Sequence, residues 1–223
     1  MILNIKRKKE FSGFSKDEIK LLKKLNTPSK IQDFLNSIEI NFEENGKETC
    51  RSPIKVLRTG KAHCMEAAMF AAAVLRFHGY PPLVMSFEAA HGDEDHVIAV
   101  YKKKNHWGAI SKTNHAILRY REPVYKSLRE LAMSYFHEYF LFADGKKTLR
   151  KYSNPVNLKM FDSSNWMSSE EELWYINDYL CKMPHNNILS RSQIKNLRRV
   201  DPIEIKAAKL LEFDDPRGEK GLP

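Results

Sequence analysis

The sequence predicts an α+β fold in which one buried helix packs on an antiparallel sheet and further helices are added at both ends of the chain. Residues 67–75 are all apolar, so a helix there has no solvent face and belongs in a core. The segment 96–101 is rich in β-branched residues, and a polar turn separates it from a second strand that begins at residue 106, which is typical of a hairpin. Amphipathic segments before residue 41 and after residue 125 predict the added helices.

Length and composition are typical of one core with a substantial extension. The chain has 223 residues, of which 42% are hydrophobic. We divide it into an N-terminal helical extension (1–50), a core (51–155) and a C-terminal helical extension with a frayed tail (156–223). Three widely spaced cysteines favour reduced thiols, and we expect Cys50 and Cys181 to take no part in chemistry.

The net charge of +9 is spread over short basic clusters along the chain. None of these clusters is interleaved with aromatic residues, and no zinc-finger or RNA-binding signature is present. We therefore expect a solvated basic surface and no specific nucleic-acid partner. The basic start of the chain is not followed by the apolar stretch of a signal peptide, and no run reaches membrane-spanning length. These features predict a cytoplasmic protein with no membrane association.

Two helices are expected before the core. Ser15 and Glu18 form a capping-box pattern for a helix over residues 15–26, and a second helix follows over residues 28–40. A polar loop and a short helical segment over 54–57 then lead to the buried helix.

Cys64 stands at the start of the buried helix. Thr59 and Gly60 precede it and allow the backbone to turn sharply. Unpaired N–H groups and the positive end of the helix dipole then point at the Cys64 sulfur, which favours thiolate over thiol. A lone buried cysteine is more often inert packing. The interpretation of Cys64 as a nucleophile therefore depends on a partner base.

The predicted hairpin supplies a base and a polar neighbour for it. With residues 102–105 as a four-residue loop, Tyr101 pairs with His106. Counting back along both strands places His96 directly opposite Ser111, on the same face of the sheet. A cysteine, a histidine and a polar side chain then follow one another along the chain as nucleophile, base and orienter.

These segments resemble the transglutaminase-like superfamily, whose members are relatives of the papain-like cysteine hydrolases. The resemblance covers about a quarter of the chain and lies in four segments, residues 59–64, 79–81, 95–97 and 107–111. It implies a papain/transglutaminase-like core in which Cys64 is the nucleophile and His96 the base. In the family an aspartate usually follows a strand tryptophan by four positions, whereas this chain has Ser111 there. A serine hydroxyl can hold the imidazole tautomer but carries no charge to stabilise imidazolium.

The resemblance implies thiol-dependent acyl transfer on a peptide or amide bond. Members of bacterial type are more often hydrolases, so we expect a cysteine peptidase or amidase that needs no cofactor and acts on a peptide or protein. Asn114 is an alternative orienter, because an amide in that role is closer to the papain arrangement. A catalytically inactive fold that binds a peptide or partner is the alternative function, and the missing aspartate favours it.

Three further helices are predicted after the hairpin. Apolar residues at helical spacing indicate one over 126–140 and another over 170–181, the latter capped by Ser168. The third begins at Asp201 and presents one apolar face, formed by Ile203, Ala207, Leu210 and Leu211.

His63, Trp107 and Asp95 are further candidates for substrate binding. His63 lies at the mouth of the buried helix, Trp107 can cover the site, and Asp95 belongs to an acidic loop, 93–95, whose charge favours a cationic substrate. No CxxC or HExxH pair is present, so no metal site is predicted. The sequence does not indicate an oligomeric state.

Overall fold

The chain combines an antiparallel sheet with helices on both of its faces, which confirms the α+β class. The computed structural model describes residues 10–43 and 46–216, so the basic start of the chain and most of the predicted frayed tail lie outside the described residues. The helices are α2 (Lys16–Lys24), α3 (Pro28–Ser37), α4 (Pro53–Thr59), α5 (Cys64–Phe77), α6 (Leu128–Met133), α7 (Trp174–Lys182), α8 (Arg191–Lys195) and α9 (Pro202–Ala208), with the 3-10 helices η2 (Phe136–Glu138) and η3 (Leu158–Ser164). The strands are β1 (Glu39–Ile40), β2 (Lys61–Ala62), β3 (Leu83–Ala89), β4 (His96–Lys103), β5 (His106–Ile110), β6 (Arg121–Tyr125), β7 (Leu149–Ser153), β8 (Val156–Asn157) and β9 (His185–Asn187).

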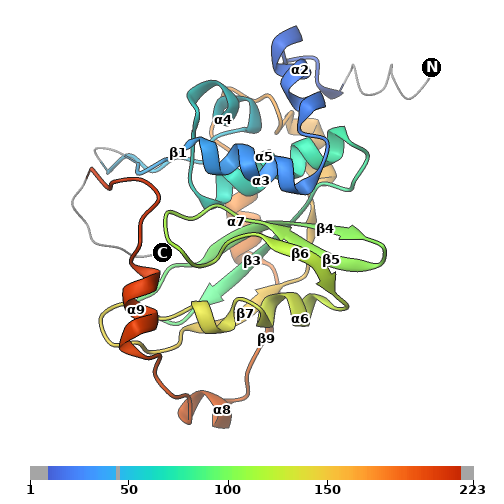
Figure 1. The fold of residues 1–223 in the computed structure, drawn as a ribbon. Coiled ribbons are helices and arrows are strands. Elements are labelled where there is room, and N and C mark those ends of the chain that lie inside the picture. The colour runs from blue at the N-terminus through green and yellow to red at the C-terminus, as the bar shows by residue number, and fades with distance from the viewer. Residues whose placement is uncertain (1–9, 44–45, 217–223) are drawn as a thin grey trace.

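The main sheet has 7 strands in the order β6-β5-β4-β3-β7-β9, with β8 beside β3. Figure 1 shows α2, α3, α4 and α5 on one side of this sheet and α6 and α8 on the other. Side chains alternate along β4 between the two sides, so Val97 and Ala99 pack with α5 while Ile98 and Val100 pack with α6. None of the described helices is long and apolar enough to cross a membrane.

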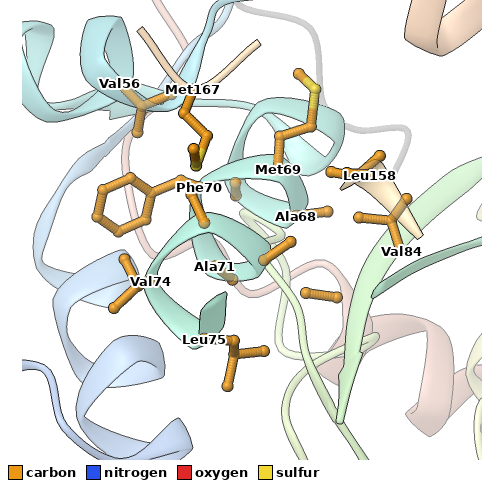
Figure 2. Close-up of a cluster of buried hydrophobic side chains, with 14 of the residues drawn as sticks. Val56, Ala68, Met69, Phe70, Ala71, Val74, Leu75, Val84, Leu158 and Met167 are labelled. Atoms are coloured by element: carbon orange, nitrogen blue, oxygen red, sulfur yellow. The ribbon is translucent and has the colours of Figure 1, made fainter. Parts of the chain in front are cut away.

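Helix α5 is the centre of the core, as its composition predicts. Every residue from Met65 to Phe77 is buried, and only Cys64 at the N-terminus is partly exposed. Figure 2 shows Val56 of α4 and Val84 of β3 packed against different sides of the helix. Within α5 itself, the partly exposed residue is the cysteine at its N-terminus.

The hairpin between β4 and β5 is tighter than the sequence predicts. Lys103 pairs with His106, so the connection is a two-residue turn, and the predicted loop over residues 102–105 is wrong. Lys104 and Asn105 both adopt positive φ, 46° and 66°, as this type of turn requires. The register therefore shifts by two residues relative to the prediction. A shift of two keeps every side chain on its predicted face, so the polar side chain expected opposite His96 becomes its diagonal neighbour instead.

The predicted helix over 126–140 is wrong in its length. Helix α6 ends at Met133, and a 3-10 turn follows at 136–138. The Ser134 hydroxyl donates to the carbonyl of Leu131 and accepts from Arg121 Nε at 3.0 Å. These bonds replace the next helical turn with an irregular segment that faces the sheet.

The C-terminal helices also differ from the prediction. Helix α7 begins at Trp174 rather than at residue 170, because the Glu172 carboxylate accepts the backbone N–H of Cys50 at 2.5 Å and holds the preceding segment against the core. Helix α9 begins after Asp201 with a complete capping box, as predicted. Its predicted apolar face is wrong, because Ile203 is 70% exposed and the helix buries Ala208 instead.

The predicted N- and C-terminal extensions contribute side chains to the same hydrophobic cluster as α5. The contributors include Leu22, Ile31 and Leu35 from the first two helices and Trp166 and Ile176 from the C-terminal part. The capping box of Ser15 and Glu18 and the helix start at Pro28 are formed as predicted.

Candidate active site

The structure places Cys64 on a short, sharply turning connection. Gly60 ends α4 with φ of 65°, a left-handed conformation that glycine adopts without strain. The two residues of β2 then lead to His63, the N-cap of α5, and Cys64 is the first helical residue. The sulfur therefore sits at the positive end of a helix whose remaining residues are buried.

His96 is buried at the start of β4, directly across from Phe87 of β3. Its Nε2 lies 2.7 Å from Ser111 Oγ, and that Oγ lies 2.5 Å from the carbonyl oxygen of Leu118. A carbonyl oxygen only accepts, so the Ser111 hydroxyl donates to Leu118 and its oxygen accepts from His96. Nε2 thus carries a hydrogen, and Nδ1 is the ring nitrogen left to exchange a proton with a nucleophile.

The Cys64 side chain lies within hydrogen-bonding reach of His63 and His96. Burial alone would raise the pKa of its thiol, but the positive charge of His96 and hydrogen bonds from His63 and His96 outweigh burial. The pKa of the Cys64 thiol therefore lies well below its ordinary value, and the thiolate is favoured. The structure thus brings together the predicted nucleophile, base and orienter.

The other two thiols lie in different surroundings. Cys50 is fully buried, and burial, together with the carboxylates of Glu66 and Glu172, raises its pKa to about 12. Cys181 is exposed on α7, and the pKa of its thiol is raised by burial of the sulfur and by nearby acidic groups. Of the three cysteines, Cys64 is the one whose surroundings favour thiolate.

His63 lies beside Cys64 and is surrounded by acceptors. Its Nε2 is 2.9 Å from the carbonyl oxygen of Thr49, 3.6 Å from Glu66 Oε1 and 3.8 Å from Glu43 Oε1. Burial lowers the pKa of His63, but its hydrogen bond with Cys64 and the negative charges of Glu66 and Cys64 raise it to about 9. The surrounding negative charges therefore favour the imidazolium form of His63.

Glu66, in the first turn of α5, is fully buried and supports this histidine. Its carboxylate accepts four hydrogen bonds, from Asn41 Nδ2, Thr49 Oγ1, Arg51 N and His63 N. Arg51 Nε also lies 3.9 Å from it. A buried carboxylate needs such partners to stay ionised. The sequence places Glu66 near Cys64 but gives no signal of these contacts.

The side chains of the other predicted site residues have partners outside the site, although Asp95 directly precedes His96 in the chain. Asn114, the alternative orienter, uses its carboxamide on the backbone of Phe213, with both hydrogen bonds at 2.9 Å. Asp95 is exposed and accepts the backbone N–H of Ala89 at 2.9 Å. Trp107 pairs with Lys102, six residues beyond the start of β4 and so about 20 Å from His96. The expectation that Trp107 covers the site is wrong.

Helix α3 holds the backbone around Ser111. The Gln32 side chain donates to the Ser111 carbonyl at 2.7 Å and accepts its N–H at 3.0 Å. The next residue, Lys112, is buried and donates to the carbonyls of Leu35 and Ile38 at the end of α3. Burial lowers the pKa of Lys112 to about 8. The N-terminal helices therefore help to position a candidate active-site residue.

A second support, missed by the sequence analysis, acts through Leu118. Leu118 has φ of 59°, a conformation that is unfavourable for a leucine. Its N–H donates to Glu138 Oε2 at 2.6 Å, and Glu138 Oε1 pairs with Arg121 Nη2 at 2.6 Å. The carboxylate thus fixes the conformation in which the Leu118 carbonyl meets Ser111. No local pattern in the sequence predicts a contact of this kind.

The comparisons with known proteins add no family. No protein-family model matches the chain, and no curated protein matches it either. Within residues 10–43 and 46–216, no three His, Cys, Asp or Glu side chains gather as a metal-binding group.

Proposed function

We propose that the protein catalyses thiol-dependent acyl transfer on a peptide or amide bond, through Cys64, His96 and Ser111 in a papain/transglutaminase-like core. The observation that carries this proposal is the hydrogen bond of His96 to Ser111, because it leaves the second ring nitrogen for Cys64 at the accessible end of a buried helix. A cysteine that serves only in packing needs no neighbouring histidine whose ring is oriented by a further hydrogen bond.

The chemistry begins with a thiolate and a protonated His96. The Cys64 sulfur attacks the amide carbonyl carbon, and the electron pair of the C=O bond moves onto oxygen. Backbone N–H groups at the start of α5, including that of Cys64, hold this oxyanion. His96 then gives its proton to the leaving amine as the C–N bond breaks, which leaves a thioester on Cys64.

Water resolves the thioester in the proposed hydrolysis. Neutral His96 takes a proton from the water as its oxygen attacks the carbonyl, and the thiolate leaves with the electrons of the C–S bond. The products are a carboxylic acid and the restored pair of Cys64 and His96. An amine in place of water would give a transamidation by the same steps.

The first test measures how the alkylation of Cys64 by iodoacetamide depends on pH, in a variant that lacks Cys50 and Cys181. We expect an apparent thiol pKa well below the ordinary value of about 8.5. A Cys64 that reacts only after unfolding would overturn the proposal and favour a catalytically inactive binding module.

The second test identifies the reaction. Unstructured peptides are incubated with the protein and with Cys64→Ala, and mass spectrometry then counts new amine and carboxyl termini. Hydrolysis gives new termini with the wild type only. If a primary amine is added and its mass appears on the peptides instead, the activity is transamidation.

A further inference from the structure

Cys64 is in contact with two histidines, and their surroundings differ. His96 faces the neutral hydroxyl of Ser111, and among the described residues it makes no ion pair with a carboxylate. His63 faces two carboxylates, Glu66 and Glu43, at 3.6 and 3.8 Å. The two carboxylates therefore stabilise a positive charge on His63. A positive charge on His96 is stabilised by the Cys64 thiolate instead.

We infer that His63 is a second catalytic histidine, a fixed imidazolium that Glu66 and Glu43 hold in place and that stabilises the Cys64 thiolate without exchanging its proton. This inference rests on the proposed function and assigns a separate task to each histidine. His96 moves protons, and His63 supplies a constant positive charge beside the reacting sulfur.

The hydrogen-bond geometry supports a permanently protonated His63. Its Nε2 faces the carbonyl oxygen of Thr49 at 2.9 Å, and a carbonyl only accepts, so this nitrogen carries a hydrogen. The same ring also hydrogen-bonds the Cys64 side chain, which is an acceptor when ionised. The carboxylates of Glu66 and Glu43 lie 3.6 and 3.8 Å from the same Nε2, and their negative charge favours the protonated form of the ring.

The balance of charge around the site is consistent with this state. Two carboxylates, Glu43 and Glu66, lie beside His63, and Arg51 Nε lies 3.9 Å from Glu66. Cys50 and Tyr139 also interact electrostatically with Cys64, and burial raises the pKa of both, that of Cys50 to about 12, so neither adds charge near neutral pH. Two histidines thus face one thiol, and the loss of either leaves the other in place.

The test compares iodoacetamide alkylation across pH in four proteins that all lack Cys50 and Cys181: the parent, His63→Gln, His96→Ala and the double variant. We expect His63→Gln to raise the apparent pKa of Cys64 by about one unit or more, which reduces the alkylation rate about tenfold at a pH below both values. In His96→Ala the pKa rises but stays depressed, and His63→Gln added to it removes the remaining depression.

His78→Gln is the matched control. His78 ends the same helix, about 20 Å from Cys64, and its Nε2 meets the carbonyl oxygen of Leu22. We expect no change in the pKa of Cys64 in this variant.

A second measurement holds even where His63→Gln fails to fold. The titration of the His63 ring is followed by NMR in the parent and in Cys64→Ala. The pKa is about 9 in the parent, and it falls in Cys64→Ala because the thiolate is lost. An unchanged thiol pKa in His63→Gln, or an unchanged His63 pKa in Cys64→Ala, would overturn the inference while the proposed function stands. An ordinary thiol pKa in the parent would instead remove the proposed function.

Discussion

Replacing Glu138 with alanine tests whether Ser111 is positioned from a distance. Glu138 does not touch the site, but its carboxylate receives the N–H of Leu118, whose carbonyl accepts the Ser111 hydroxyl. Without that carboxylate, we expect Leu118 to leave its left-handed conformation. Its carbonyl then turns away from Ser111, which frees the hydroxyl to donate to His96.

The expected loss of stability follows from the bonds that are removed. A hydrogen bond to a charged group contributes about 1.5–3 kcal/mol, and relaxation of a left-handed leucine returns about 1–2 kcal/mol. Arg121, whose side chain is 13% exposed, also loses its partner. We therefore expect a net destabilisation of about 2 kcal/mol, which lowers the melting temperature of a protein of this size by about 4–8 °C.

Two measurements separate positioning from stability. Thermal unfolding followed by circular dichroism gives the stability, and nitrogen chemical shifts of His96 give its tautomer. At a pH where the His96 ring is neutral, we expect its hydrogen on Nε2 in the wild type and shared between the two nitrogens in Glu138→Ala. Asp178→Asn is the control, because Asp178 forms an exposed pair with Lys182 worth about 0.5 kcal/mol or less. A destabilised Glu138→Ala whose His96 tautomer is unchanged would refute the positioning role.

Three further changes are informative. Ser111→Ala removes one neutral hydrogen bond to His96, so we expect turnover of a cleaved peptide to fall by about 3–15-fold; a loss near 10⁴-fold, as for a charged orienter, would contradict a neutral role. Cys64→Ala abolishes turnover and, because Cys64 lies at an exposed helix end, changes the free energy of unfolding by about 1 kcal/mol or less in urea denaturation. The pKa of Lys112 is lowered from 10.5 to about 8 in the folded state, so its contribution to the free energy of unfolding rises by about 3 kcal/mol between pH 8 and 10.5. Urea denaturation across that range should show this rise in the wild type and not in Lys112→Met. An equal pH dependence of the unfolding free energy in the two proteins would contradict the role of the lysine.

Local patterns predicted those parts of the fold that depend on local forces. The apolar run of α5 and the capping box at Ser15 are complete within a few residues, and both are formed. The hairpin register was wrong because Lys104 takes a left-handed conformation that its residue type does not signal. The supports of the site were missed for a different reason. Gln32 contacts Ser111 across 79 residues of chain, and no single-sequence pattern encodes such a distance.

A serine at position 111 fits this site better than an aspartate would. Ser111 Oγ lies 2.5 Å from the carbonyl oxygen of Leu118 and donates its hydrogen there. A carboxylate has no hydrogen to donate, so its oxygen and the carbonyl oxygen of Leu118 would be two acceptors in repulsive contact. It would also add negative charge next to a thiolate and raise the pKa of the thiol. The negative charge is instead placed behind His63, where Glu66 is buried and fully hydrogen-bonded. In the proposed mechanism His63 holds the cation on that side, and His96 then needs only an oriented neutral partner to move protons.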